Sequence, residues 1–258
     1  REDALHSVLL QIGEGVGQAT RMAGALNALN VFQQGDPAYA FNDFKYVAPA
    51  DYRVVGIEVF GKGDEYDTDG KFGSWYGHAL DKGWYVGPAG SEDHHETNWG
   101  GGNLPKTVVI SRANNQADIR EAFLARRFYT VAQNENALRI NFEAVTQDNQ
   151  RLPMGSRIGT KANTVQFEFN VSSIDPMDAL QDMSFELFSS QSGPRSNQEQ
   201  RYLPLQTQTG KNGRFTVTPS DGKNWYFVRV KRGDRIVAVS APIWIFKGSE
   251  PLPECAAS

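Results

Sequence analysis

The segment 90–102 has the densest set of side chains in this sequence that could do chemistry. It reads Gly-Ser-Glu-Asp-His-His-Glu-Thr-Asn-Trp-Gly-Gly-Gly and holds two of the four histidines and three acidic residues. Asp93 and His95 have the spacing Asp-x-His, and on an irregular backbone two such side chains can turn toward one cation. A carboxylate with an imidazole suits zinc, manganese or iron. The alternative is a polar loop whose Asp and His side chains cap turns.

Glu58 is a second candidate, because it interrupts an apolar run. Residues 52–60 read as a strand buried on both faces. A carboxylate inside such a strand is unfavourable unless it is paired or bound to a cation, and otherwise it must point to solvent at the strand's edge. A second short strand is predicted at residues 84–86, so the 90–102 loop would leave the carboxyl end of a strand. Parallel sheets and barrels build their sites there.

The elements that would position these residues alternate between helical and strand patterns, which indicates an α/β arrangement. Helical periodicity covers residues 4–29, with a glycine-rich break at 13–17. Further helices are predicted at 75–82 and 115–126, and further strands at 31–32, 107–110 and 127–131.

The period changes from about residue 138, where apolar and polar residues begin to alternate. The alternating segments are 138–145, 164–171, 183–188, 213–218, 225–231 and 235–239. Strict alternation with turn residues between the segments is typical of antiparallel sheets that have one wet face. We therefore expect an immunoglobulin-like β-sandwich, joined to the first half near residues 132–137.

The composition excludes some classes of protein. A formal net charge of -4 gives no reason to expect nucleic-acid binding. No apolar run approaches the ~20 residues that a membrane-spanning helix needs. The single cysteine, Cys255, can form no internal disulfide, which leaves the compartment open.

Several segments, taken in order, resemble one known family. They are Gly56–Phe60, Gly83–Trp99, Ile119–Thr130, Pro153–Ser156, Trp225–Val230 and Ser240–Ile245. The series is similar to the polymerase-and-histidinol-phosphatase (PHP) superfamily of metal-dependent phosphoesterases, and especially to its secreted or envelope branch. The resemblance implies the C-terminal part of a distorted (β/α)₇ barrel over residues 1–135, the immunoglobulin-like sandwich over 136–247, and a tail over 248–258.

The resemblance also implies a hydrolase acting on a phosphate mono- or diester. Asp93 and His95 would be metal ligands and catalytic residues, with Glu58 and Asp36 as further candidate ligands. Two or three zinc, manganese or iron ions would polarise the phosphoryl group and activate a bound water. The expected location is secreted, periplasmic or in the cell envelope.

The sequence departs from that family at one important point, because the opening His-x-His motif has no counterpart. Two explanations follow. In the first, the chain is a proteolytic fragment that begins at Arg1, and an N-terminal segment of the same precursor supplies the missing motif and completes the barrel. In the second, the chain is a degenerate, non-catalytic envelope or interaction protein that uses the barrel and sandwich as a binding scaffold.

Overall fold

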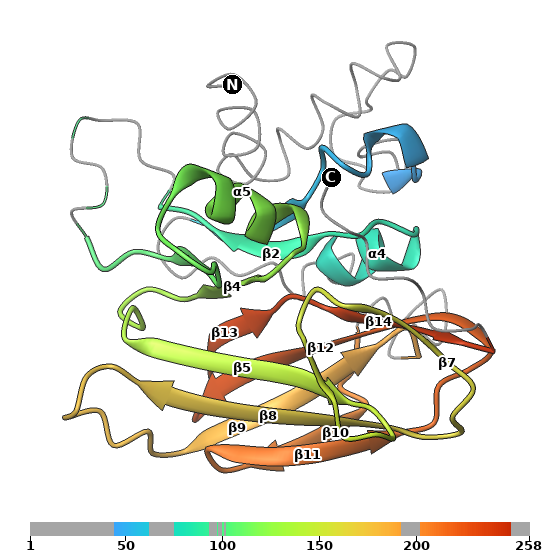
Figure 1. Ribbon diagram of the computed structural model, residues 1–258. Coiled ribbons are helices and arrows are strands. Elements are labelled where there is room, and N and C mark those ends of the chain that lie inside the picture. Colours follow the sequence, from blue (N-terminus) through green and yellow to red (C-terminus); the bar gives the residue numbers. More distant parts are fainter. Residues whose placement is uncertain are drawn as a thin grey trace.

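β-Strands are the main regular structure of the protein, as the computed structural model shows for residues 44–61, 75–92, 97, 100, 102–191 and 202–248. Within these ranges the chain forms fourteen strands, two α-helices and one 3-10 helix, η2 (Ala48–Ala50). The strands make two large sheets that face each other, and the helices lie on the far side of one of them (Figure 1).

The smaller of the two large sheets, here called the four-stranded sheet, is antiparallel with the order β11-β8-β5-β6. Its strands are β5 (Leu138–Val145), β6 (Arg151–Pro153), β8 (Val165–Ser173) and β11 (Asn212–Val217). Every second residue of β5 is buried, and β8 follows the same pattern. Side chains of period two put one face of this sheet in the core and leave the other in water.

The eight-stranded sheet has the order β10-β9-β12-β13-β4-β3, and in addition β14 pairs with β12 and β7 pairs with β14. Its strands are β3 (Lys106–Val109), β4 (Phe128–Val131), β7 (Arg157–Thr160), β9 (Met183–Ser189), β10 (Gln206–Thr209), β12 (Gly222–Arg232), β13 (Arg235–Ser240) and β14 (Ile243–Lys247). The long strand β12 pairs with β14 through residues 222–226 and with β13 through residues 229–232. One strand therefore ties two parts of the sheet together.

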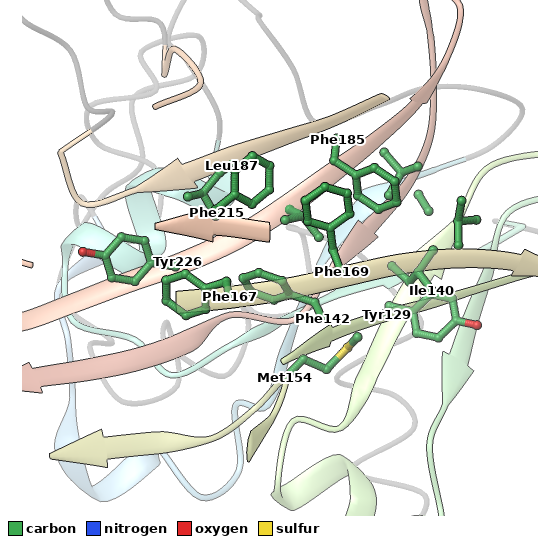
Figure 2. Close-up of a cluster of buried hydrophobic side chains, with 14 of the residues drawn as sticks. Tyr129, Ile140, Phe142, Met154, Phe167, Phe169, Phe185, Leu187, Phe215 and Tyr226 are labelled. Carbon is green, nitrogen blue, oxygen red and sulfur yellow. The ribbon is translucent and has the colours of Figure 1, made fainter. Parts of the chain in front are cut away.

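Aromatic side chains fill the space between the two sheets (Figure 2). The rings of Phe169 and Phe185, which come from opposite sheets, have centroids 4.0 Å apart. Phe142 and Phe167 stack at 5.2 Å on the four-stranded sheet. Fully buried rings of this size supply much of the free energy that stabilises a sandwich.

A third layer covers the other face of the eight-stranded sheet. It contains β1 (Gly56–Phe60) and β2 (Gly87–Gly90), which pair in parallel, together with α4 (Trp75–Asp81). The hydroxyl of Tyr76 on α4 donates to the carbonyl oxygen of Ser240 at 3.1 Å, and the Tyr76 ring packs on Phe227 of β12. Helix α5 (Gln116–Leu124) packs through Phe123 against Phe128 at the start of β4.

This architecture corrects the expected fold class. The described residues form a nearly all-β structure with two α-helices, and the predicted (β/α)₇ barrel is wrong. The resemblance to the PHP superfamily is contradicted too, because that resemblance implies the barrel. Strands β3 and β4, which were expected in a barrel, instead extend the eight-stranded sheet, because β4 pairs antiparallel with β13 and β3 pairs antiparallel with β4.

Individual elements agree better with the sequence patterns than the barrel does. The six alternating segments of the second half form β5, β8, β9, β11, β12 and β13, and the helices predicted at 75–82 and 115–126 are α4 and α5. The strand predicted at 84–86 is wrong, because pairing with β1 begins only at Gly87. The patterns at 4–29 and 31–32 lie outside the described residues. No described helix has the length and apolarity to cross a membrane.

Candidate functional site

Of the four residues predicted to hold metal, only Glu58 falls in the part of the chain that the structure describes. Asp36, Asp93 and His95 lie outside it. Glu58 is half-buried in the middle of β1, and its Oε1 accepts a hydrogen bond of 3.0 Å from the hydroxyl of Ser91. The backbone amide of Ser91 in turn donates to the carbonyl oxygen of Phe60, so Ser91 is fixed beside the strand. Hydrogen bonding within the chain thus accounts for a polar group at this position.

The expectation of metal binding finds no support in the described part of the chain. Across the described ranges, no three histidine, cysteine, aspartate or glutamate side chains come close enough together to hold a metal ion. A structural or catalytic zinc site needs at least three protein ligands. The part of the structure that can be seen therefore gives no support to a metal-binding protein of the PHP type.

A polar groove lies on the outer face of the four-stranded sheet, away from the core. It is open, has a volume of about 530 Å³, and crosses all four strands. Its lining residues are Asn141, Glu143, Arg151, Glu168, Phe169, Asn170, Asn212, Gly213 and Arg214. All of these residues except Phe169 and Gly213 have side chains with hydrogen-bonding groups, so the groove can bind a polar ligand.

One row of the groove consists of three asparagines, here called the Asn row. Asn141 of β5 is the register partner of Asn170 of β8, and Asn170 is the partner of Asn212 of β11. Residues directly opposite each other in an antiparallel sheet project from the same face. The three amides are therefore neighbours on one surface. Among the described residues, none of these three side chains has a hydrogen bond to another part of the chain.

Three asparagines in register are unexpected in strand interiors. Asparagine is depleted in strands because its short amide competes for local backbone groups and packs poorly on a pleated surface. Residues that oppose the local structural preference without an evident structural gain are candidates for a functional role. The Asn row meets that criterion at three adjacent strands.

The next row carries charges. Glu143 lies opposite Glu168, and Arg214 lies on the other side of Glu168. The guanidinium groups of Arg151 and Arg214 both form ion pairs with Glu168. Hydrogen bonds from Arg151 and then from Arg214 lower the pKa of Glu168, so this carboxylate stays ionised. The two arginines relieve the repulsion between the facing carboxylates, and the carboxylate of Glu143 is left open to the groove.

The floor of the groove is rigid where β11 meets β8. Gly213 is the register partner of Phe169, and a Cβ at Gly213 would lie 2.5 Å from Cζ of that ring. The ring itself is held between Phe185 and Phe215. Glycine is therefore required for the backbone of β11 to approach the ring. Side chains on β10 also fix β11, since Nε2 of Gln208 donates to the carbonyl oxygen of Arg214 at 2.6 Å.

A second polar cluster joins the third layer to the eight-stranded sheet. Nζ of Lys223 and Cζ of Arg157 each lie 3.6 Å from the centroid of the Tyr85 ring. Lys223 also donates to the carbonyl oxygen of Gly83 at 2.8 Å, while Arg157 contacts Asp51 at 3.3 Å. Burial, and then the charge of Arg157, lowers the pKa of Lys223 to about 8. The cluster is a cation–π contact between layers.

Arg126 holds the same layer from the end of α5. It is buried and has a φ of 55°, a left-handed conformation that is uncommon for a residue with a side chain. Its guanidinium donates to the carbonyl oxygens of Tyr85 at 2.6 Å and Asp51 at 2.7 Å. The side chain therefore ties the end of α5 to two segments of the third layer.

A third polar network closes one end of the sandwich. Arg232 on β12 pairs with Asp178 at 3.0 Å and with Glu135 at 3.1 Å, and Arg235 on β13 pairs with Glu135 at 2.8 Å. The hydrogen bond from Arg232 lowers the pKa of Asp178 to about 2. This network connects the segment before β5 to the hairpin of β12 and β13, which is a structural task.

Sequence reasoning did not find the groove. Asn141 and Asn170 each sit at an outward position inside a segment predicted to be a strand, and that was the available signal. Their juxtaposition with Asn212 depends on the pairing of β5, β8 and β11, because a shift of one residue would turn one set toward the core. The register comes from the structure.

Comparisons with known proteins do not assign this chain to a class, so the class is described from the geometry of the chain itself. No protein-family model matches the sequence, and no curated protein matches it. A DUF3823 family protein from Bacteroides ovatus ATCC 8483 is similar over 46% of this chain and 74% of its own, with a TM-score of 0.23 and 8% sequence identity. Such a low score supports no inference about fold or function. The structure itself defines a two-sheet β-sandwich with an added α/β layer and a polar groove.

Proposed function

We propose that this chain is a non-catalytic binding module whose ligand site is the groove on the four-stranded sheet. The observation that carries the proposal is the Asn row, with its three amides in register and without partners among the described residues. Each amide offers one acceptor and two donors. The row thus presents a fixed set of hydrogen-bonding groups to a ligand.

The scaffold suits binding because the lining side chains lie on paired strands. Phe142 and Phe169, the neighbours of Asn141 and Asn170 along their strands, are buried in the core. A side chain on a packed strand is held in position more firmly than one on a loop. Little conformational entropy is then lost at the protein when a ligand binds.

The proposal develops the interaction protein that the sequence left open as an alternative. Metal-dependent hydrolysis stays a prediction, because its residues Asp93 and His95 lie outside the described part. The expected envelope or secreted location stays a prediction as well. What supports binding is positive: a groove of about 530 Å³ with polar lining on a rigid sheet.

The test is a titration of isotope-labelled protein followed by NMR. Three classes of polar ligand would be added in turn: neutral saccharides, neutral dipeptides and nucleosides. We expect at least one class to shift the side-chain amide signals of Asn141, Asn170 and Asn212 more than other signals, and the double variant Asn141→Ala/Asn170→Ala to lose the response.

Two control variants on the same strand separate the groove from the rest of the sheet. Gln166→Ala and Ser172→Ala change partly or fully exposed positions of β8 that do not line the groove. Both should keep the response. The proposal is wrong if no class shifts the Asn signals, or if the double variant responds as the unmodified protein does.

A further inference from the structure

We infer that the ligand of the groove is a neutral carbohydrate, bound through its hydroxyl groups. The inference rests on the proposed function, since it names the ligand class of the same site. Three properties carry it: the balance of charge in the groove, the kind of hydrogen-bonding groups, and the size and openness of the surface.

The charges of the groove cancel. Arg151 and Arg214 face Glu143 and Glu168, and both arginines are engaged by Glu168. An anionic ligand attracted to the two guanidinium groups, each 53% exposed, would also meet the open carboxylate of Glu143, and a cationic ligand attracted to that carboxylate would also meet the guanidinium groups. Like-charge contacts select against both kinds of ion. The groove therefore favours a ligand that is polar and uncharged.

The groups that remain available are amides and one carboxylate. An amide donates and accepts at neighbouring atoms, so it can bind two adjacent hydroxyl groups of which one accepts and the other donates. The carboxylate of Glu143 accepts from a hydroxyl and cannot pair with a carbonyl oxygen. A peptide backbone needs as many donors as acceptors in a line along one strand edge, whereas the Asn row runs across the strands. Adjacent hydroxyl groups on a sugar ring match the amides better.

The dimensions fit a short oligosaccharide. The Asn row spans three strands, which is ~10 Å at the usual distance between strands. The charged row lies two residues further along each strand, at ~7 Å. This surface has about the length of a disaccharide and the width of one ring, and its open shape leaves both ends of a longer chain free to continue.

The affinity should be low. Phe169 is the aromatic residue among the lining side chains, and it is only 2% exposed, so no ring is available for a sugar to stack on. Binding then depends on hydrogen bonds that replace hydrogen bonds to water, each with a small net gain. We expect a Kd on the order of 1 mM for a disaccharide.

The experiment compares four defined probes by NMR titration of the full chain. They are cellobiose and maltose as neutral disaccharides, a disaccharide that contains glucuronic acid, and the capped dipeptide N-acetyl-Ser-Asn-amide, which carries no charge. We expect at least one neutral disaccharide to shift the side-chain amides of the Asn row with a Kd on the order of 1 mM, and the acidic disaccharide to bind at least fivefold more weakly. Asn170→Ala should weaken the neutral sugar at least threefold, while Ser172→Ala should not.

The outcomes distinguish this inference from the proposed function. If the dipeptide shifts the Asn row and neither neutral sugar does, the carbohydrate is wrong and the binding module stands. If the acidic disaccharide binds as well as the neutral ones, the argument from charge is overturned. The inference that the ligand is neutral is then wrong too. If no probe shifts the row at concentrations up to ~50 mM, the carbohydrate is wrong, and if the nucleosides also leave the row unshifted, the binding module is wrong as well.

Discussion

The ammonium nitrogen of Lys223 lies 3.6 Å from the centre of the Tyr85 ring, so a strand of the sandwich holds the loop that leads into β2. Burial of this amine lowers its pKa from 10.5 to about 8, with the charge of Arg157 as the second cause. In the unfolded chain the amine takes up its proton at the higher pKa. Between these two values the unfolded state binds more protons, so the folded state gains relative stability as pH rises.

We therefore expect a stability increase between pH 8 and pH 10.5 that depends on Lys223. Its size should be about 1 to 2 kcal/mol after allowance for solvent screening. Urea unfolding at several pH values, compared between the unmodified protein and Lys223→Met, measures it as a difference. Lys231→Met, on the same strand, is the control. The same pH profile in the unmodified protein and in Lys223→Met would contradict the expectation.

Removing the Arg126 side chain should weaken the attachment of the third layer. Arg126→Ala takes away the donors to Tyr85 and Asp51 and leaves Oδ1 of Asp51, which is buried without a hydrogen bond, without its charged neighbour. We expect a loss of about 3 kcal/mol of unfolding free energy, because buried polar groups lose their partners.

Two further variants show whether the contacts or the backbone cause that loss. Arg126→Gly should be more stable than Arg126→Ala by up to ~1 kcal/mol, because a φ of 55° suits glycine. Arg53→Ala, at an exposed position, should change stability by less than ~0.5 kcal/mol. Thermal and urea unfolding give these values. An Arg126→Ala variant as stable as Arg53→Ala would show that the contacts contribute nothing.

The ion pair between Asp178 and Arg232 should stabilise the fold except in strong acid. The pKa of Asp178 falls from 3.8 to about 2, so its contribution is complete above pH 3.8 and is lost as pH falls through about 2. Asp178→Asn should cost about 1 kcal/mol at pH 7 and nearly nothing at pH 2. Acid-dependent urea unfolding tests this. Asp234→Asn, in the hairpin beside it, should show no such convergence.

A methyl group at Gly213 should clash with the core. In Gly213→Ala the new Cβ would meet Oε1 of Gln208, whose side chain is flexible, and the Phe169 ring, which is held by Phe185 and cannot move aside. We expect a loss of ~1 to 3 kcal/mol from overpacking. Adding Phe169→Leu should recover part of it, so the two changes together cost less than their sum. Additive losses in chemical unfolding would mean that the close approach is not what limits residue 213.

We expect the asparagines of the Asn row to lower the stability of the fold while they provide ligand binding. Threonine suits a strand better than asparagine, so Asn141→Thr and Asn170→Thr should each raise the unfolding free energy by up to ~0.5 kcal/mol. Each should also weaken ligand binding, because the amide is gone. Thermal unfolding and NMR titration on the same samples check both effects. If the variants are less stable, the asparagines have a structural role and the functional argument fails.

The strands of the second half could be predicted because their signal is local. In the segment 138–145, alternate residues must face the core, and the period of two is visible in the letters alone. The partner of a strand cannot be predicted in this way. No feature of β4 indicates that its partner is β13, which follows only after β5 to β12 in the chain. Long-range contacts of this kind are set by the packing of the whole domain.

The barrel was expected from the resemblance to the PHP superfamily, and local structure alone does not test that expectation. The unit of β1, α4 and β2 has the parallel pairing that every (β/α) barrel repeats, and one such unit looks the same whether or not others follow. Strand β2 itself, Gly-Pro-Ala-Gly, has almost no strand preference. It forms because its glycines allow close approach to Phe128 and to the carbonyl oxygen of Lys106, contacts that the sequence does not show.

The pairing of β4 with β13 also constrains the order of events during folding. During synthesis β4 emerges from the ribosome long before β13, and the whole of the four-stranded sheet is made in between. Until β13 arrives, the edge of β4 that it will cover has no partner among the strands described here. We therefore expect the nascent chain to fold late and cooperatively, with a high contact order, a slow rate and a transient need for protection from aggregation.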